Sequence, residues 1–412
     1  MARVPDPLPA AARNFGVRWP LTFSTAAHRA KRRDDPGGGA AATEKGDDDP
    51  ERPLREATAL MTEPPRASTV DVHAHIDAPA VYGLVQDEPG LAAEQAAQFA
   101  TFGAESIQRN IELMTTSYRP PLDDLSVRLA QMDAAGVDIQ AISVVPTLYH
   151  YWADAPLAND IVAVANEHIA AAVAEKPDRL VGLATVALQH PELAADQLRM
   201  AHSQLGMRGA EISTSVPGRD LSDPALDPFW AAAEELGSFL FIHPWGCSLG
   251  SRLALGYLGN VIGQPAETTI ALHHLVFGGV LDRFPSLRIC AAHGGGYFPH
   301  YLGRADHAYQ VRPESRHMAR PPSAYLDSLY FDSLVYTGDA LSRLVSIAGA
   351  DHILLGTDYP FDMGVTDPVE RIGAIGLPPA GRDAITGGNA ARLLSRPAQP
   401  RSVRRNAAAR PG

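Results

Sequence analysis

The chain has 412 residues, of which 45% are hydrophobic and 20% are charged, so it can bury a large core as a soluble globular protein. Its formal net charge of -12 disfavours nonspecific binding to nucleic acid, which requires an excess of lysine and arginine. No apolar run approaches the roughly 20 residues that span a bilayer, and two cysteines do not make a disulfide framework. We therefore expect a cytoplasmic protein with no membrane partner.

The two ends of the chain differ in composition from its middle. Residues 1–67 contain Pro36-Gly37-Gly38-Gly39 and an aspartate-rich run but no sustained apolar period, so we expect a disordered extension. Met61 lies just before the first predicted strand, and we put forward the hypothesis that it is the true start. Residues 397–412 are rich in proline and arginine and are expected to form a flexible tail.

Between these ends, residues 68–396 alternate short apolar runs with helical patterns. β-branched or leucine-rich runs are typical of strands that are buried on both faces of a parallel sheet. The predicted strands are Thr69–His75, Ile139–Val145, Leu180–Leu188, Gly209–Ser215, Phe239–Pro244, Leu287–Gly294, Leu329–Val335 and Ile353–Asp358. Apolar residues at helical spacing predict helices over Asn159–Ala174, Glu192–Leu205 and Pro228–Leu236.

Eight strands separated mostly by helices predict a (β/α)8 barrel, a TIM-like fold. A doubly wound open sheet is the structural alternative, although no glycine-rich dinucleotide fingerprint follows the first strand. The long segments 77–122 and 246–267 are additional to the repeat, and we expect them to cover one mouth of the barrel.

The first predicted strand carries the strongest local motif, Val70-Asp71-Val72-His73-Ala74-His75. Residues two apart on a strand point to the same face, so His73 and His75 can aim at one point. Imidazole suits zinc and similar divalent ions. Two histidines can also alternate on a strand by chance, so this motif alone does not establish a metal site.

Further polar residues end other predicted strands. His243 ends an apolar run, His293 ends the next one, and Asp358 ends the last. Active sites of (β/α)8 barrels are built at the carboxyl ends of the strands. A set of three histidines and one aspartate with another histidine nearby leaves a coordination position open, which is typical of a catalytic metal site. Each residue alone could equally be a satisfied histidine or a loop cap.

The chain resembles the amidohydrolase superfamily and, within it, the aminocarboxymuconate-semialdehyde decarboxylase family. The resemblance covers residues 69–395, and its motifs stand in family order. The HGGG and GTDYPF elements are the specific ones, whereas HxH alone is weak. The matching segments are 71–75, Gln131–Asp138, His243-Pro244-Trp245, Gly263–Thr269, His293-Gly294-Gly295-Gly296, Leu302-Gly303-Arg304 and Gly356-Thr357-Asp358-Tyr359-Pro360-Phe361.

This resemblance implies a Zn²⁺ ion, or another divalent metal, held by His73, His75, His243 and Asp358. It implies that His293 is the catalytic acid/base beside the metal, and it counts Asp358 among the catalytic residues. No organic cofactor is implied.

The resemblance also implies a set of substrate-binding residues. Arg304 and Arg119 would bind the carboxylates of a small substrate, and Trp245 and Phe361 would line its pocket. In the family the arginine that matches Arg304 reaches the active site of a neighbouring subunit, so a homodimer is implied. The match at Arg119 requires a gap, and an ordinary exposed loop arginine is the alternative interpretation.

One segment departs from the family pattern. Gly256 and Asn260 stand where the family's decarboxylase carries aromatic residues, so the shape of the pocket and the exact substrate stay open. Tyr149-His150-Tyr151-Trp152 could supply compensating aromatic rings or could simply pack in the core.

Other candidate residues have structural interpretations. His273 and His274 are neighbours in a helical stretch and do not share a face, so we expect structural roles. Cys247 is expected to line the pocket, and Cys290 to lie in the core.

The predicted reaction is nonoxidative, metal-dependent decarboxylation of a small unsaturated or aromatic acid. The same site could instead hydrolyse a lactone, ester or amide, or hydrate an unsaturated acid. A noncatalytic binding module is the third interpretation, and the presence of every proposed ligand together with His293 argues against it.

Overall fold

The computed structural model describes residues 68–395. The expected disordered extension, the hypothetical start at Met61 and the expected flexible tail all lie outside the described residues. Among residues 68–395, no helix combines the length and the apolar character that crossing a bilayer requires.

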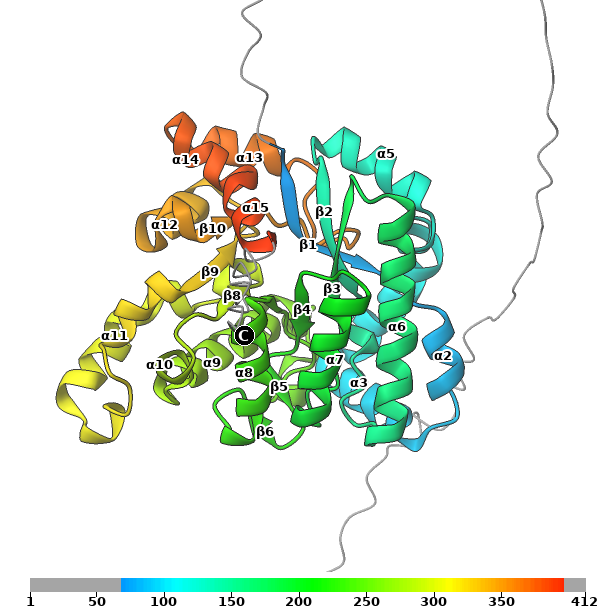
Figure 1. Cartoon of the computed structure of the whole chain (residues 1–412), viewed down its shortest axis with the longest axis horizontal. Coiled ribbons are helices and arrows are strands. Elements are labelled where there is room, and N and C mark those ends of the chain that lie inside the picture. Colours follow the sequence, from blue (N-terminus) through cyan, green and yellow to red (C-terminus); the bar gives the residue numbers. More distant parts are fainter. Residues whose placement is uncertain (1–67, 396–412) are drawn as a thin grey trace, which may run out of the picture. The chain divides into compact units, whose positions relative to one another are not determined.

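The core of the domain is an eight-stranded parallel sheet with the order β1-β2-β3-β4-β7-β8-β9-β10 (Figure 1). Every neighbouring pair in this order is parallel. The strands are β1 Val70–Ile76, β2 Ile139–Val144, β3 Leu180–Ala184, β4 Gly209–Ile212, β7 Phe239–Ile242, β8 Arg288–Ala291, β9 Leu329–Asp332 and β10 Ile353–Leu354. A short antiparallel pair, β5 Ser215–Val216 and β6 Arg219–Asp220, lies outside this sheet.

The last strand lies alongside the first, so the sheet closes into a barrel. The amide of Val72 donates to the carbonyl of Leu355 at 2.9 Å, and the amide of Asp358 donates to the carbonyl of His73 at 2.9 Å. A parallel bridge joins Ala74 to Tyr359. The predicted (β/α)8 barrel is confirmed, and the open doubly wound sheet is wrong.

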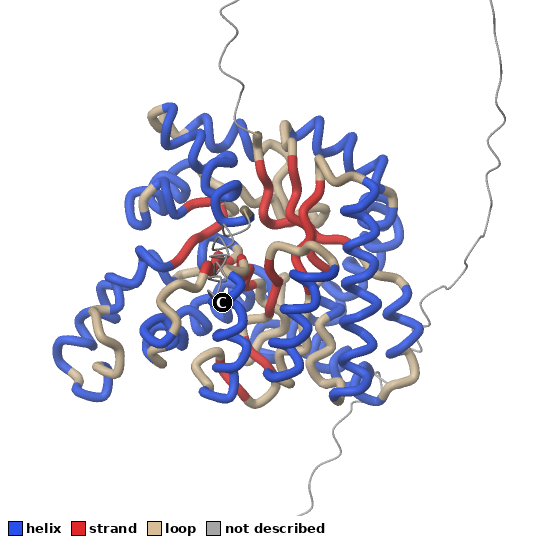
Figure 2. Tube along the Cα trace, in the orientation of Figure 1, coloured by secondary structure: helices blue, strands red, loops and turns tan. Residues whose placement is uncertain are grey.

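Helices surround the strands (Figure 2). The predicted helices over 159–174, 192–205 and 228–236 correspond to α6, α7 and α8. Helix α6 begins earlier than predicted because Asp154 caps it, accepting a hydrogen bond from the amide of Leu157 at 3.1 Å. The α-helices are α2 Ala80–Val85, α3 Pro89–Leu113, α4 Arg119–Asp123, α5 Leu125–Ala135, α6 Ala155–Glu175, α7 Pro191–Gln204, α8 Asp227–Leu236, α9 Gln264–Phe277, α10 Val280–Arg283, α11 Phe298–Val311, α12 Gly338–Ala348, α13 Pro368–Ala374, α14 Pro379–Asp383 and α15 Asn389–Leu394.

Short 3-10 and π segments complete the described fold. The 3-10 segments are η3 Pro146–Leu148, η4 Pro224–Leu226, η5 Gly250–Leu253, η7 His293–Gly295, η8 Pro313–Ser315, η9 Pro322–Ser328 and η10 Ala350–His352. The π segments are η2 Met114–Tyr118, η6 Gly259–Gly263 and η11 Ala384–Gly388.

Several ladders end before the predicted strand does. β3 ends at Ala184 rather than at Leu188, and β10 is paired with β9 over Ile353 and Leu354 alone. The residues after β10 instead bond to β1, and the amide of Leu355 donates to the carbonyl of Ile385 at 3.0 Å. The apolar runs continue beyond the ladders because the strand exits are buried as well.

The two additional segments meet at the carboxyl end of the barrel. The first contains α2, α3, η2 and α4, the second contains η5, η6 and the start of α9, and α3 packs against both η5 and η6. Trp245, in the loop after β7, donates to Glu94 of α3 at 3.1 Å. This arrangement agrees with the expectation that the segments cover one mouth.

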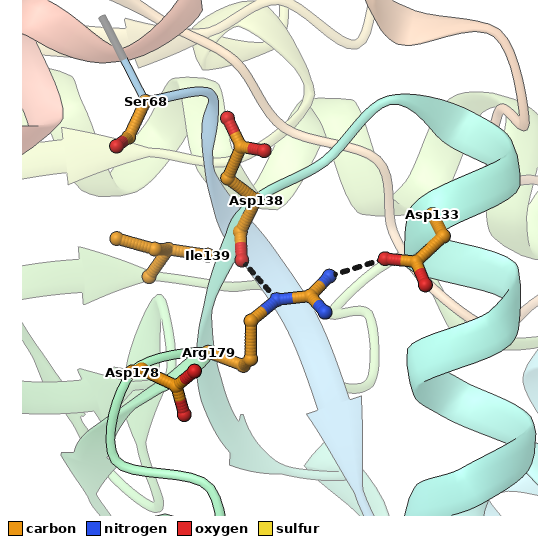
Figure 3. A pocket seen from close by; sticks show the side chains of 6 residues that line it. All are labelled: Ser68, Asp133, Asp138, Ile139, Asp178 and Arg179. Atoms are coloured by element: carbon orange, nitrogen blue, oxygen red, sulfur yellow. Dashed lines mark hydrogen bonds and ion pairs between the residues drawn. The ribbon is translucent and has the colours of Figure 1, made fainter. Parts of the chain in front are cut away.

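The opposite, amino-terminal end of the barrel contains a separate pocket of about 460 Å³ (Figure 3). Arg179, just before β3, lies across it and donates to the carbonyl of Asp138 at 2.6 Å and to the carboxylate of Asp133 at 2.7 Å. These bonds join the start of β2 to the end of α5. Interactions at this end of a (β/α)8 barrel serve stability rather than catalysis.

Candidate metal centre and active site

Four metal-capable side chains converge at the carboxyl end of the barrel. They are His73 and His75 of β1, His243 after β7 and Asp358 after β10. One ligand atom of each lies within 4.8 Å of the others, and all four residues are buried. The period of two along a strand turns both β1 histidines toward the barrel axis.

The unused nitrogen atoms of this cluster fit a divalent cation. Nε2 of His73, Nε2 of His75 and both ring nitrogens of His243 are buried and have no hydrogen-bond partner among the described residues. Each of the two β1 Nε2 atoms lies 3.4 Å from Oδ1 of Asp358. Buried polar atoms without partners are costly, and coordination of a cation would satisfy them. Three imidazoles and one carboxylate are a donor set that suits zinc and similar ions.

The electrostatics of the cluster keep its carboxylate ionised, although burial and the neighbouring imidazoles lower the pKa of His243 well below its ordinary value. Burial lowers the pKa of His73, but the carboxylates of Asp358 and Asp332 outweigh it and raise that pKa to about 10. Burial alone would raise the pKa of Asp358, but His73 and its neighbouring imidazoles hold it well below its ordinary value. The carboxylate therefore stays ionised at neutral pH, ready to bind a cation.

A second row of buried carboxylates orients the β1 histidines. Asp332, at the end of β9, accepts hydrogen bonds from Nδ1 of His73 and from the amide of Gly294, both at 2.7 Å. Glu211 of β4 lies 3.7 Å from Nδ1 of His75, which is itself 3.2 Å from the carbonyl of Val144. Such partners fix the ring orientation of a ligand histidine.

Sequence reasoning missed both of these carboxylates. Asp332 lies within a predicted strand, and Glu211 lies within another. The rule that identified Asp358, a carboxylate near the carboxyl end of a barrel strand, would also have indicated these two.

His293 lies beside the four-residue cluster, and its side chain is slightly more exposed than those of the cluster. Its ring centroid is 5.1 Å from that of His243 and 5.2 Å from that of His73, and its Nε2 is 3.8 Å from Oδ2 of Asp358. Nδ1 of His293 has no partner among the described residues. Its backbone φ of +56° is unusual for a side-chain-bearing residue, and such conformations concentrate at functional sites.

The glycines after His293 pack too closely for a larger residue. A Cβ on Gly295, whose φ is +74°, would lie 2.5 Å from the ring of Phe331. Glycine is therefore required there both by conformation and by space.

Aromatic residues form part of the rim. The ring of Phe361 is 5.5 Å from that of His75 and 5.2 Å from that of Tyr118. Trp245 is half-buried, two residues beyond His243. Phe361 therefore lies close to the metal-capable cluster in space, and Trp245 lies close to it in sequence.

The tyrosines of the 149–152 segment pack in the core. The rings of Tyr149 and Tyr151 stack with centroids 5.4 Å apart, and both residues are buried. Tyr149 donates its hydroxyl hydrogen to Glu211, while Trp152 donates to Glu94 at 2.8 Å. Their contacts favour the packing interpretation over compensating pocket aromatics.

The two predicted carboxylate-binding arginines lie in different settings. Arg119 follows Tyr118 near the rim, but its guanidinium is 3.2 Å from Asp77 and 2.6 Å from Asp123. Arg304 is exposed on α11 and has no hydrogen bond or ion pair within the described residues. The structure of one chain thus does not bring Arg304 together with the metal-capable cluster.

His273, His274 and Cys290 take structural positions, whereas the predicted place of Cys247 in the pocket stays a prediction. Nδ1 of His273 lies 2.8 Å from the carbonyl of Thr269 in its own helix, and Nδ1 of His274 lies 2.9 Å from the hydroxyl of Ser222. Cys290 is fully buried in β8, whereas Cys247 is partly exposed in the loop after β7.

Sequence comparison agrees with the class of enzyme that this barrel and its metal-capable cluster define. Residues 70–396 match the amidohydrolase family, and the chain belongs to that family.

Two relatives within this class are decarboxylases. The chain is 38% identical over 274 residues to 2-amino-3-carboxymuconate-6-semialdehyde decarboxylase of Dictyostelium discoideum, covering 66% of this chain and 76% of the relative. It is 30% identical over 292 residues to the gamma-resorcylate decarboxylase of Rhodococcus jostii, covering 66% and 88% respectively. The protein is therefore a carboxy-lyase similar to aminocarboxymuconate-semialdehyde decarboxylase.

Solved structures share the fold. The crystal structure of 5-carboxyvanillate decarboxylase from Novosphingobium aromaticivorans superimposes with a TM-score of 0.68 at 24% identity, covering 80% of this chain and 96% of that one. That enzyme was crystallised with manganese and 4-hydroxy-3-methoxy-5-nitrobenzoic acid.

Proposed function

We propose that this protein removes CO2, without oxidation, from a small unsaturated or aromatic carboxylic acid, using a divalent ion held by His73, His75, His243 and Asp358. One observation carries the proposal: buried, unpartnered imidazole nitrogens surround a carboxylate at the barrel's carboxyl end, with His293 beside them. The relatives that are decarboxylases of carboxymuconate and resorcylate acids support this class of substrate.

The bound ion would act as a Lewis acid, stabilising negative charge on a substrate oxygen. His293 would deliver a proton to the substrate carbon. The new C–H bond forms with an electron pair of the substrate's unsaturated system. The bond from the carbon to the carboxylate then breaks, CO2 leaves, and the electron pair of the broken bond restores the unsaturated system. The position of His293, beside the ligands, partly exposed and with Nδ1 unpartnered among the described residues, supports this role as an acid/base.

Substrate carboxylates would be bound by Arg119 and Arg304, whose planar guanidinium groups can form paired hydrogen bonds with a carboxylate. Arg119 would exchange part of its contact with Asp77 for the substrate. Phe361 and Trp245 would flank the substrate's flat carbon skeleton. The closeness of Phe361 to the His75 ring supports its place in this wall.

The exposed surface around Arg304 supports a homodimer. Tyr301 of α11, three residues before Arg304, is 67% exposed, and Tyr297 at the start of that helix is 43% exposed. Tyr297 donates to the carbonyl of Val261, which is 48% exposed itself. A second copy that covers this apolar face would bury these rings, and Arg304 of one chain would then reach the active site of the other.

We propose Zn²⁺ as the native ion and the cytoplasm as the location. Imidazole-rich sites suit zinc, whereas the solved neighbour holds manganese, so both ions belong in the test. Two free cysteines are in keeping with a reducing compartment.

The test combines metal analysis with CO2 release over a panel of unsaturated and aromatic acids. We expect release by the metal-loaded enzyme and none after chelation. His293→Asn should keep about one ion per chain while turnover falls by about 10²–10⁴-fold, and His243→Asn should lose the ion. Hydrolysis or hydration products without CO2 release would contradict the proposal and favour the alternative reactions.

A separate experiment tests the shared site. Mixed dimers of an Arg304→Ala chain with a His293→Ala chain contain one site in which both residues are intact. We expect partial recovery of activity in the mixed dimer relative to either parent. Verified mixed dimers without recovery would exclude a crossing Arg304 and leave the decarboxylase proposal standing.

A further inference from the structure

Arg128 is a fully buried arginine that contacts no carboxylate within the described residues. It lies on α5, outside the barrel wall, and its side chain has no exposed surface. Nη1 donates to Oε1 of Gln140 at 2.9 Å, Nη2 donates to the backbone carbonyl of His75, and the guanidinium stacks 4.7 Å from the ring of Tyr359. A buried charge is costly, so these particular contacts must offset its desolvation.

The hydrogen bonds continue from Arg128 toward the metal-capable residues. Nε2 of Gln140, on β2, donates to Oδ2 of Asp71 at 3.0 Å. Asp71 in turn accepts from the amide of His73 at 3.0 Å, from the amide of Thr357 at 3.1 Å and from the hydroxyl of Thr357 at 2.7 Å. Gln140 thus links a buried cation to a buried anion, and every side chain in the series is almost completely buried.

The endpoints of this series are the backbones that carry three of the four candidate ligands. Arg128 holds the carbonyl of His75, Asp71 holds the amide of His73, and Asp71 also holds Thr357, the residue before Asp358. These are the segments where the first and last strands of the barrel meet. A shift of either backbone would move a ligand atom away from the common centre.

We propose that Arg128 and Gln140 are positioning residues that set the affinity of the metal centre by fixing the two ligand-bearing segments against each other. The proposal rests on the metal site of the proposed function and assigns a task to two residues that touch neither the ion nor the substrate. Loss of partners that orient ligands reduces metal affinity by about 10–100-fold in known sites.

The alternative is that the series only closes the barrel. Then its removal would lower stability in general, as would the loss of any similar buried network, and would leave the affinity for the ion unchanged. Arg179 provides a control at the opposite end of the barrel, where it is partly exposed and donates three hydrogen bonds. Figure 3 shows those to Asp138 and Asp133.

The experiment measures the dissociation constants of Zn²⁺ and Mn²⁺ by chelator competition in the full chain for wild type, Arg128→Lys, Gln140→Leu and Arg179→Lys. Lysine keeps the charge of Arg128 but cannot reach both acceptors, and leucine removes the bridging amide. We expect about 10–100-fold weaker binding in the first two variants. We expect a change of no more than about twofold in Arg179→Lys, which is distant from the site.

A second readout separates folding from metal affinity. The rise in melting temperature that a fixed concentration of ion produces should be smaller in Arg128→Lys and Gln140→Leu than in wild type, because that rise depends on the dissociation constant. If Arg128→Lys does not fold, Gln140→Leu alone decides the question.

Dissociation constants equal to wild type, or an equal loss in Arg179→Lys, would overturn the inference. A wild-type chain that binds neither ion would instead overturn the proposed function.

Discussion

Asp332→Asn is the most informative single substitution near the metal centre, because it preserves shape while removing one acceptor and a charge. The carboxylate accepts from Nδ1 of His73 on one oxygen and from the amide of Gly294 on the other, each at 2.7 Å. Asparagine offers one acceptor and one NH2 group, so one of these two donors must face another donor. The buried donor left without a partner costs about 1–3 kcal/mol.

The substitution should hold the ring of His73 less firmly in its orientation, and the affinity for the metal should fall as a result. At 1.4 kcal/mol for each factor of ten, we expect Zn²⁺ to bind about 5- to 140-fold more weakly. Chelator competition measures the change, and circular dichroism establishes that the variant is folded. A dissociation constant within twofold of wild type in folded protein would refute the argument that Asp332 orients this ligand.

The effect of Asp332→Asn on the free energy of unfolding should depend on pH. Burial raises the pKa of Asp332, but the hydrogen bond and charge of His73, together with His293 and the amide of Gly294, outweigh burial and lower that pKa overall. A carboxyl with a lowered pKa contributes stability above its unfolded value of about 4, and this contribution is lost as pH falls through the folded-state pKa. The difference in unfolding free energy between wild type and Asp332→Asn should therefore shrink below about pH 4. A difference that stays constant from neutral to acid pH would contradict this assignment.

Three other outcomes follow from the site. Glu94 accepts hydrogen bonds from both Trp152 and Trp245. Glu94→Gln should therefore change the tryptophan fluorescence spectrum and raise KM more than it lowers kcat. An unchanged spectrum would count against these two hydrogen bonds. Gly295→Ala should lower the free energy of unfolding by about 1–3 kcal/mol through overpacking, whereas Gly373→Ala, where a Cβ has open space, should not; equal melting temperatures in the two variants would refute the packing argument. Chelation should lower the melting temperature reversibly, and a temperature insensitive to added Zn²⁺ would exclude a bound ion.

The sequence predicted those parts of the fold and site that depend on local patterns. His73 and His75 share one strand, so a period of two was enough to place them together. Asp358 and His243 end apolar runs, and the rule on barrel strand ends brought them to the same edge. The closed barrel followed from the alternation of strands and helices.

Features that depend on the choice of partner could not be predicted in this way. Nothing local to Asp332 indicates that it bonds to a histidine on the first strand, and nothing local to Arg119 indicates that Asp77 holds it. The predicted strands were also longer than the observed ones. Apolar composition indicates that a residue is buried, and the residues after β3 and β10 are buried although they do not continue the ladder with the neighbouring strand.

The junction between the last strand and the first has a consequence for how the protein is made. Asp71 bonds to Thr357 across 286 residues of chain, and His73 meets Asp358 over a similar separation. During synthesis the first two histidines leave the ribosome long before the aspartate that completes their cluster. The barrel cannot close until the last strand has been made, and contacts of such long range slow folding. An ion that binds all four residues would link the first strand of the barrel to the segment after the last strand. The supply of metal would then govern the yield of folded protein as well as its activity.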